Sequence, residues 1–189
     1  MHQPNAPLTP PSLFPPLPSR YYTGQATFPA FAGISLTTFD VTGATGFGAS
    51  QAQTLVAGDA GALRSYSVKV TNTGSRTGDQ VVFMFAKPGN LTAQAPSPLI
   101  RRLVGFERVH LAPGASAVVD FNVTVETLQM VSAGREGNFD FSSLSSMGDI
   151  VSTPGTFTVQ FSTGGANADI EQLVTVTGDE IVLAPFPKF

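Results

Sequence analysis

Short runs in which apolar and polar residues alternate dominate the sequence from Phe28 onward. The clearest run covers residues 117–125, and similar runs cover residues 66–70 and 157–161. A period of two residues places one face of a β-strand in a core and the other face in water. Residues 81–86 are apolar at every position, so we expect a central strand whose outer face is covered by a docked neighbour.

Proline–glycine pairs separate several of these runs, and each pair can form a type II turn. The pairs are Pro88-Gly89, Pro113-Gly114 and Pro154-Gly155. Weaker alternation at residues 35–42, 99–104 and 170–176 raises the expected number of strands to seven. Seven short strands are typical of an immunoglobulin-like β-sandwich, so the predicted fold class is all-β. We expect one or two helical turns at residues 126–131 and a long loop at residues 134–152.

The first twenty residues differ from the rest of the chain, because seven of the fifteen prolines lie there. Proline cannot donate to a sheet ladder, so residues 1–20 are predicted to form a disordered, proline-rich tail or linker. Residues 15–20 also fit the PxxPxR pattern of an SH3 ligand. We expect residues 21–40 to lead into the domain and residues 41–189 to form the β-sandwich, since 189 residues suit a single core.

Composition excludes several classes of function. Only 12% of the residues are charged and the net charge is -3, so the chain lacks the basic surface that binds nucleic acid or an anionic membrane. No apolar run approaches the length of about 18 residues that a membrane-spanning helix needs, and the N-terminus does not have the pattern of a secretory signal. The sequence contains no cysteine, which excludes disulfides and zinc–thiolate sites.

No pattern in the sequence predicts a catalytic, cofactor or metal site. A glycosidase needs two convergent carboxylates. Here the carboxylates are scattered singly, as at Asp79, Asp120, Glu136 and Asp140, and they are interpreted as solvated or turn-capping groups. The two histidines, His2 and His110, have no nucleophile motif to serve, and His110 lies in a small basic patch at residues 101–110. We therefore expect no catalytic residue, no cofactor and no bound metal.

Two sequons for N-glycosylation occur, at Asn90 and Asn122. The alternation places Asn122 on the outward face of its strand, and Asn90 follows a predicted turn, so both are expected to be accessible. Sugar rings usually stack on exposed tryptophan or tyrosine, and the chain has no tryptophan and three tyrosines. A glycan-binding platform is therefore the less favoured interpretation.

Four ordered blocks of sequence form a recognisable set. Residues 28–39 read FPAFAGISLTTF and residues 70–82 read VTNTGSRTGDQVV, while residues 103–121 read LVGFERVHLAPGASAVVDF and residues 154–159 read PGTFTV. In this order they resemble the YPFGHGLSYTTF, VTNTGxRxGDEVV, LxGFxRxxLxPGxSxxVxF and PGxYxV segments of one known domain. That domain is the C-terminal fibronectin type III-like domain of glycoside hydrolase family 3, the family of β-glucosidases and β-xylosidases.

The resemblance implies a structural role without catalysis. In that family the nucleophile and the acid/base lie on domains that precede the matched segment, so no catalytic residue is carried over to this chain. The implied partners are the glycoside hydrolase catalytic domains in the same polypeptide, which this domain would pack against and stabilise. We expect the interdomain packing to use five phenylalanines, namely Phe28, Phe31, Phe39, Phe83 and Phe85. The family also implies an extracellular, vacuolar or cell-wall location.

This sequence departs from the family pattern in the first block. Phe31 and Ala32 stand where the family has glycine and histidine, and Leu36 replaces an aromatic residue. A second interpretation is therefore kept, in which the chain is a stand-alone binding or adhesion module for a glycan or a protein. Such a module would use its exposed sheet or its proline-rich tail.

Overall fold

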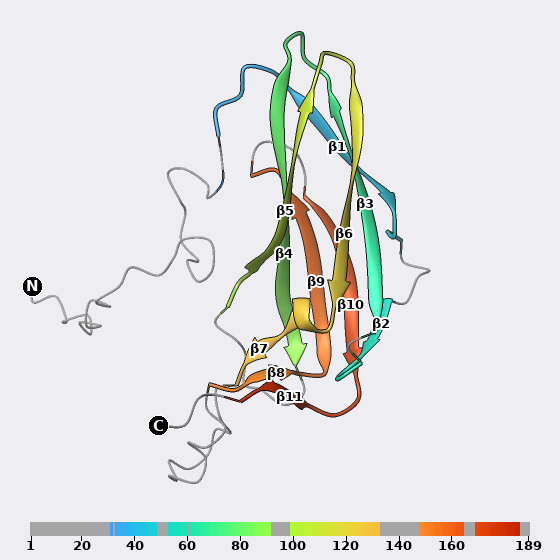
Figure 1. The fold of residues 1–189 in the computed structure, drawn as a ribbon, viewed down its shortest axis with the longest axis vertical. Coiled ribbons are helices and arrows are strands. Elements are labelled where there is room, and N and C mark those ends of the chain that lie inside the picture. The colour runs from blue at the N-terminus through green and yellow to red at the C-terminus, as the bar shows by residue number, and fades with distance from the viewer. Residues whose placement is uncertain are drawn as a thin grey trace, which may run out of the picture.

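The computed structural model describes residues 31, 33–48, 53–59, 61–91, 99–132, 148–164 and 169–185. The expected tail and SH3 ligand of residues 1–20, Phe28 and most of the expected loop at residues 134–152 lie outside these residues. The described part of the chain folds into eleven strands and one short helix (Figure 1). The predicted all-β fold class is confirmed.

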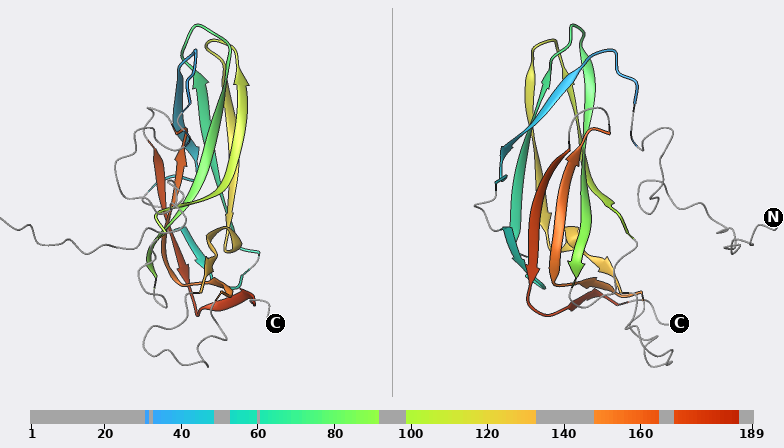
Figure 2. Two further views of the ribbon diagram at one scale, coloured as in Figure 1. Left: turned by 90° about the vertical axis from the view of Figure 1, so that its left-hand side faces the viewer. Right: turned by 180° about the vertical axis from the view of Figure 1, so that it is seen from behind.

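Two sheets, one antiparallel and one mixed, form the main body and stack as two layers (Figure 2). The three-stranded sheet has the order β1 (Phe39–Thr45), β3 (Leu63–Asn72), β6 (Ser116–Thr124). The five-stranded sheet has the order β2 (Gln53–Val56), β10 (Ile170–Thr177), β9 (Gly155–Ser162), β4 (Gly78–Leu91), β5 (Arg102–Leu111), in which only β2 runs parallel to its neighbour. The chain passes between the sheets at the β3–β4 and β5–β6 connections, which lie together at the upper end in Figure 1.

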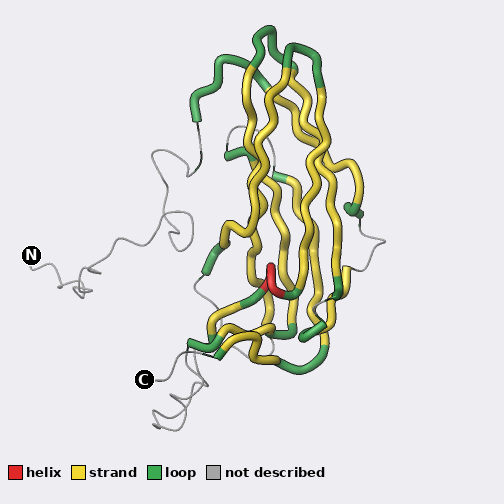
Figure 3. Tube along the Cα trace, viewed as in Figure 1, coloured by secondary structure: helices red, strands yellow, loops and turns green. Residues whose placement is uncertain are grey.

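A third, smaller sheet lies at the lower end of the sandwich in Figure 1. It has the order β11 (Ile181–Ala184), β8 (Ile150–Ser152), β7 (Met130–Val131). The expected helix at residues 126–131 is only partly correct. A single 3-10 turn, η1 (Glu126–Leu128), is drawn red in Figure 3, and Met130 and Val131 pair with β8 instead.

All seven expected strands are present, as β1, β3, β4, β5, β6, β9 and β10. The prediction that Pro88-Gly89 forms a turn is wrong. Both residues lie inside β4, which continues to Leu91 because β9 runs alongside it and pairs Pro88 with Phe157. A register shift between Pro88 and Leu91 accommodates the missing N–H of the proline. The turn at Pro113-Gly114 does form, and Gly114 takes the positive φ of 75° that a type II turn requires.

The core lies between the two large sheets and is built by the alternating residues. Phe161 of β9 is at its centre, with its ring centroid 5.3 to 5.6 Å from those of Phe47, Tyr66 and Phe121. These rings join both sheets, because Tyr66 and Phe121 pair across β3 and β6 while Phe161 comes from the opposite layer. Burying each such side chain stabilises the fold by about 1.5 to 3 kcal/mol.

The hydroxyl of Tyr66 is buried in this aromatic cluster and finds no hydrogen-bond partner within the described part of the chain. Burial raises the pKa of Tyr66 to about 12, since the phenolate would be poorly solvated. We therefore expect Tyr66→Phe to stabilise the protein by about 1 kcal/mol, because it removes an unsatisfied polar group and keeps the ring. Urea denaturation of both proteins measures this difference. A clear loss of stability would show that the hydroxyl is hydrogen-bonded.

Candidate docking surface

The outer face of β4 is apolar, as the sequence predicted. Val82, Met84 and Ala86 point into the core, so Val81, Phe83 and Phe85 point away from it. Phe85 is nevertheless only 1% exposed. Its ring lies 5.4 Å from that of Phe31, and the guanidinium carbon of Arg101 lies 4.4 Å from its centroid. The expectation that a docked neighbour alone covers this strand is therefore corrected, because the chain covers part of it by itself.

The apolar surface extends onto β5, the edge strand beside β4. Phe106 pairs with Phe83 and Leu103 pairs with Phe85, and residues paired across a ladder share a face. Phe106 is 64% exposed, and Leu103 and Phe31 are each 38% exposed. We call the surface formed by Phe31, Phe83, Phe85, Leu103 and Phe106 the outer apolar face. Because apolar residues exposed side by side are candidates for contact with a partner, this face is the candidate docking surface.

The four described phenylalanines of the five expected at an interdomain contact have two different locations. Phe31, Phe83 and Phe85 meet on the outer apolar face, where the Phe31 and Phe83 ring centroids lie 4.8 Å apart. Phe39 is placed differently, because β1 belongs to the other sheet and its first residue packs in the core at 7% exposure. Phe28 lies outside the described residues.

Sequence reasoning missed Phe106 and Leu103. The expected strand ended at residue 104, whereas β5 continues to Leu111. A register shift between Met84 and Phe85 breaks the alternation near Val104, so the period of two is not visible across the whole strand. The signal that could have found Phe106 is the apolar outer face of β4, because a neighbouring strand can extend such a face.

Asn72 fixes the segment that precedes β1 to the sandwich. We call its described residues, 31 and 33–38, the lead-in segment. Asn72 is fully buried at the end of β3, where its Nδ2 donates to the carbonyl oxygens of Arg76 and Leu111, each at 2.8 Å. Its Oδ1 accepts from Thr37 Oγ1 at 2.9 Å and from the Gly74 N–H at 3.0 Å. One side chain thus joins three of the four sequence blocks in space.

Phe31 is held where the lead-in segment reaches the sheet. It has a φ of 68°, which a bulky residue adopts only when its surroundings enforce it. The rings of Phe83 and Phe85 hold its side chain, and its backbone carbonyl lies against Gly164, where no Cβ would fit. Gly164 also has a positive φ, of 70°. Glycine is therefore favoured there both by its backbone conformation and by the lack of room for a side chain.

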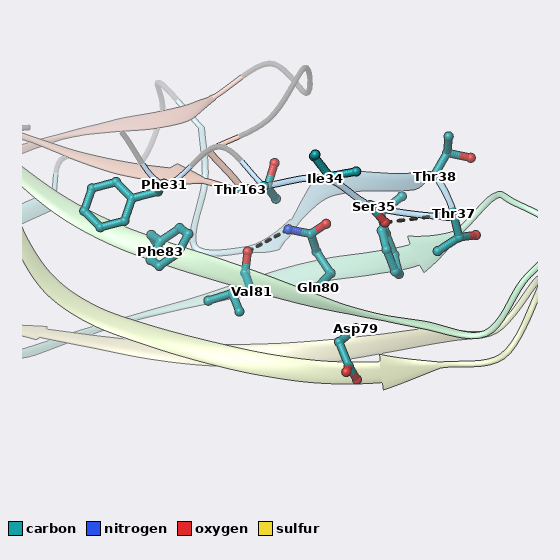
Figure 4. A pocket seen from close by; sticks show the side chains of 12 residues that line it. Phe31, Ile34, Ser35, Thr37, Thr38, Asp79, Gln80, Val81, Phe83 and Thr163 are labelled. Carbon is teal, nitrogen blue, oxygen red and sulfur yellow. Dashed lines mark hydrogen bonds between the residues drawn. The ribbon is translucent and has the colours of Figure 1, made fainter. Parts of the chain in front are cut away.

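A groove of about 390 Å³ runs between the lead-in segment and β4 (Figure 4). Phe31 and Phe83 line one end of it, and Ser35, Thr37 and Gln80 contribute polar groups further along. Asp79 is the one carboxylate among its lining residues, and in Figure 4 its side chain points away from Ile34 and Thr163. The groove therefore offers no pair of carboxylates.

A polar cluster of Asp79, Arg108 and His110 lies at the rim of the outer apolar face. Arg108 Nη2 lies 2.5 Å from one carboxylate oxygen of Asp79, and Nδ1 of His110 lies 2.6 Å from the other. These hydrogen bonds hold the pKa of the Asp79 carboxyl below its ordinary value of 3.8, and the bond from Arg108 has the larger effect. The side chains of Arg108 and His110 are largely accessible to water, and that of Asp79 is 38% exposed.

This lowered pKa gives a prediction for pH. Because the folded pKa of Asp79 lies below the unfolded one, its contribution to stability is present above the unfolded pKa and is lost as pH falls through the folded pKa. We expect Asp79→Asn to unfold at a lower temperature than the wild type near neutral pH, and the difference to vanish in acid. Thermal unfolding of both proteins from neutral to acid pH measures the difference in unfolding temperature. In the Arg108→Gln control, NMR titration should show the pKa of Asp79 returning toward its ordinary value.

A second polar cluster lies on the same sheet, around the buried amide of Gln160. Its Nε2 donates to Asp169 at 2.8 Å and to Glu171 at 3.1 Å, while Arg101 donates to its Oε1 at 3.2 Å. Lys87 pairs with Glu171 at 2.7 Å. Two cations and two carboxylates thus balance each other, so these carboxylates are engaged in a structural network.

The outer face of the three-stranded sheet has the opposite character. Hydrogen bonds cross it between Ser65 and Asn122 at 2.9 Å, and between Ser67 and Asp120 at 2.6 Å. Asn122 is exposed, as the alternation predicted, and Asn90 at the far end of β4 is exposed as well. The two faces of the sandwich are therefore unlike, with one suited to contact and one suited to water.

Among the described residues, no group of three or more histidine, aspartate or glutamate side chains is arranged to hold a metal ion. No helix in the described part of the chain has the length and apolarity to cross a bilayer.

Comparison with known proteins identifies the fold and several relatives. Residues 80–163 match the fibronectin type III-like domain family. The chain is 30% identical over 183 residues to a probable exo-1,4-beta-xylosidase of Aspergillus terreus, a match that covers 92% of this chain and 21% of that protein. It is 30% identical over 156 residues to a xylan 1,4-beta-xylosidase of Xylanibacter ruminicola, covering 82% of this chain and 15% of the relative. The chain therefore spans about a fifth or less of the length of these relatives.

Solved structures show the same fold. A β-glucosidase from Kluyveromyces marxianus, determined in complex with glucose, superposes with a TM-score of 0.58 at 21% identity. The superposition covers 86% of this chain and 17% of the β-glucosidase chain.

Proposed function

We propose, from the premise that this chain carries a fibronectin type III-like domain, that it is a non-catalytic accessory domain. In this role it packs against the catalytic domains of a β-xylosidase or β-glucosidase and stabilises them. The observation that carries the proposal is the outer apolar face, where Phe106, Leu103 and Phe31 remain exposed beside a buried Phe85. A monomer kept in water gains nothing from such a patch, whereas a docked domain would cover it.

The path of the chain supports the same surface. Phe31 packs on Phe83 and Phe85, so the lead-in segment meets the sandwich at the outer apolar face. A domain connected through residues 1–30 would be held beside this face at a high effective concentration. A modest apolar contact is then enough to keep the two domains together.

The chemistry of the described residues supports a role without catalysis. Among its lining residues the groove beside β4 has the single carboxylate Asp79, which Arg108 and His110 engage. Asp169 and Glu171 meet on the amide of Gln160, and Glu171 also pairs with Lys87. Neither arrangement resembles the acid and base that face each other across a sugar in a glycosidase.

Mixing this chain with a catalytic partner tests the proposal. The partner is the portion of the Aspergillus terreus exo-1,4-beta-xylosidase outside the region aligned here, expressed separately. We expect a one-to-one complex in sedimentation and a higher unfolding temperature of the catalytic portion. A monomeric chain that leaves the partner unchanged and binds xylo-oligosaccharides would support the stand-alone module instead. Hydrolysis of an aryl β-xyloside by the isolated chain would contradict both interpretations.

The proposal includes the location. A domain that serves a secreted-type glycosidase would work outside the cell or in the cell wall or vacuole with its enzyme. Export of the natural full-length protein, followed by fractionation of the culture, tests this part.

A further inference from the structure

The edges of the two large sheets are protected unequally. An unpaired edge strand can pair with another chain, and proteins prevent this with short strands, bulges or charged side chains. β2 has only four residues, and β1 contains a register shift between Gly43 and Thr45. β5 carries Arg102, Glu107, Arg108 and His110, and a register shift interrupts it as well.

β6 is neither short nor interrupted by a bulge, and it has only one charged residue. All nine of its residues pair with β3 without a register shift, and it contains no proline. Its one charged residue, Asp120, is engaged by Ser67 of the neighbouring strand at 2.6 Å. Val118 is 57% exposed on the same face. A regular strand rich in valine with so little charge is prone to edge-to-edge pairing.

The sequon at Asn122 lies on this strand. Asn122 is exposed, and only its Oδ1 is engaged, by the hydroxyl of Ser65 at 2.9 Å. Within the described part of the chain its Nδ2 makes no hydrogen bond. Asn122 also lies on the three-stranded sheet, whereas the outer apolar face belongs to the five-stranded sheet, so a large solvated group on Asn122 leaves the outer apolar face uncovered.

We propose that Asn122 is an N-glycosylation site and that the glycan protects the β6 edge from pairing with a second chain. The donor is a polyprenyl-diphosphate-linked oligosaccharide. Nδ2 of Asn122 forms a bond to the anomeric carbon and loses a proton, the bond from that carbon to phosphate oxygen breaks, and polyprenyl diphosphate leaves. Nothing is oxidised or reduced. The proposal does not depend on which protein covers the outer apolar face.

Occupancy is tested on the full chain secreted from a glycosylating eukaryotic host. Peptide mapping by mass spectrometry, with and without peptide N-glycosidase, is expected to find a glycan on Asn122 in the wild type and in Thr124→Ser. Asn122→Gln and Thr124→Val should lack it. The same peptide map shows whether Asn90 carries a glycan. The sequon of Asn90 ends at a threonine outside the described residues. An unmodified Asn122 in the secreted wild type would overturn the proposal.

The protective role is tested on the unmodified chain made in bacteria. We expect it to aggregate several-fold faster in light scattering than the glycosylated chain. Asn122→Lys should slow this aggregation without any glycan, because it puts a charge on the edge. Ser65→Lys is the matched control, since it places the same charge opposite Asn122 on the interior strand β3. Equal protection by both lysines, or equal solubility with and without the glycan, would overturn the proposal.

Discussion

Replacing Asn72 by alanine is expected to lower the free energy of unfolding by about 3 kcal/mol, although no apolar contact is lost. The side chain makes four hydrogen bonds, two as donor and two as acceptor, and at about 0.5 to 1 kcal/mol net each they contribute about 3 kcal/mol together. Removing the amide leaves the buried carbonyl of Leu111 and the hydroxyl of Thr37 without this partner. For a chain of this size, such a loss corresponds to a fall in the unfolding temperature of about 10 °C.

Thr73→Ala is the matched control for this change. Thr73 is the next residue. Among the described residues its hydroxyl bonds only to the exposed Thr38 hydroxyl, so its replacement should cost well under 1 kcal/mol. Urea denaturation of the three proteins gives the comparison. If Asn72→Ala were as stable as Thr73→Ala, the buried network would contribute nothing, and the account of how the lead-in segment is fixed would be wrong.

Phe106→Asp is expected to weaken binding to the catalytic portion of the xylosidase by about 30-fold or more. Phe106 lies at 64% exposure on the outer apolar face, so the isolated domain should fold normally with aspartate there. In the complex, however, a carboxylate would be buried among Phe83 and Leu103 without a partner. Truncating a residue at the centre of an interface typically costs 2 kcal/mol or more, and an unpaired buried charge adds to this.

Val118→Asp is the control for the docking variant. Val118 is 57% exposed, close to the value for Phe106, but it lies on the outer face of the three-stranded sheet. The same charge is introduced on the face that the proposal leaves in water. Titration calorimetry of the two variants and the wild type measures the difference. Equal weakening by both variants would place the contact elsewhere on the molecule.

The strands could be predicted well because their signal is local. Alternation in residues 66–70, 117–125 and 157–161 reports directly which side chains face a core, and the structure buries Val68, Phe121 and Val159 accordingly. The apolar run at residues 81–86 predicted that both faces of β4 would be covered. The failure at Pro88-Gly89 is also informative, since a turn signal gave way to the ladder formed with β9.

The candidate site was harder to predict because its members come from separate segments. The ring of Phe85 contacts Phe31 and Arg101, which are far from it in the sequence. These contacts exist only in the folded chain. The sequence pattern does not distinguish Phe39 from Phe31, yet Phe39 is in the core and Phe31 is on the outer apolar face. Phe106 joins that face through its register with Phe83, and a register shift hides this from the alternation.

The sequence by itself thus determined the class of fold, the core-facing residues of the main strands and the outward position of Asn122, because each depends on the period of two along a single strand. Only the tertiary structure decided which apolar side chains remain available for a partner and which sheet edge is left unprotected. These properties depend on pairing between strands distant in sequence, and no local pattern specifies that pairing.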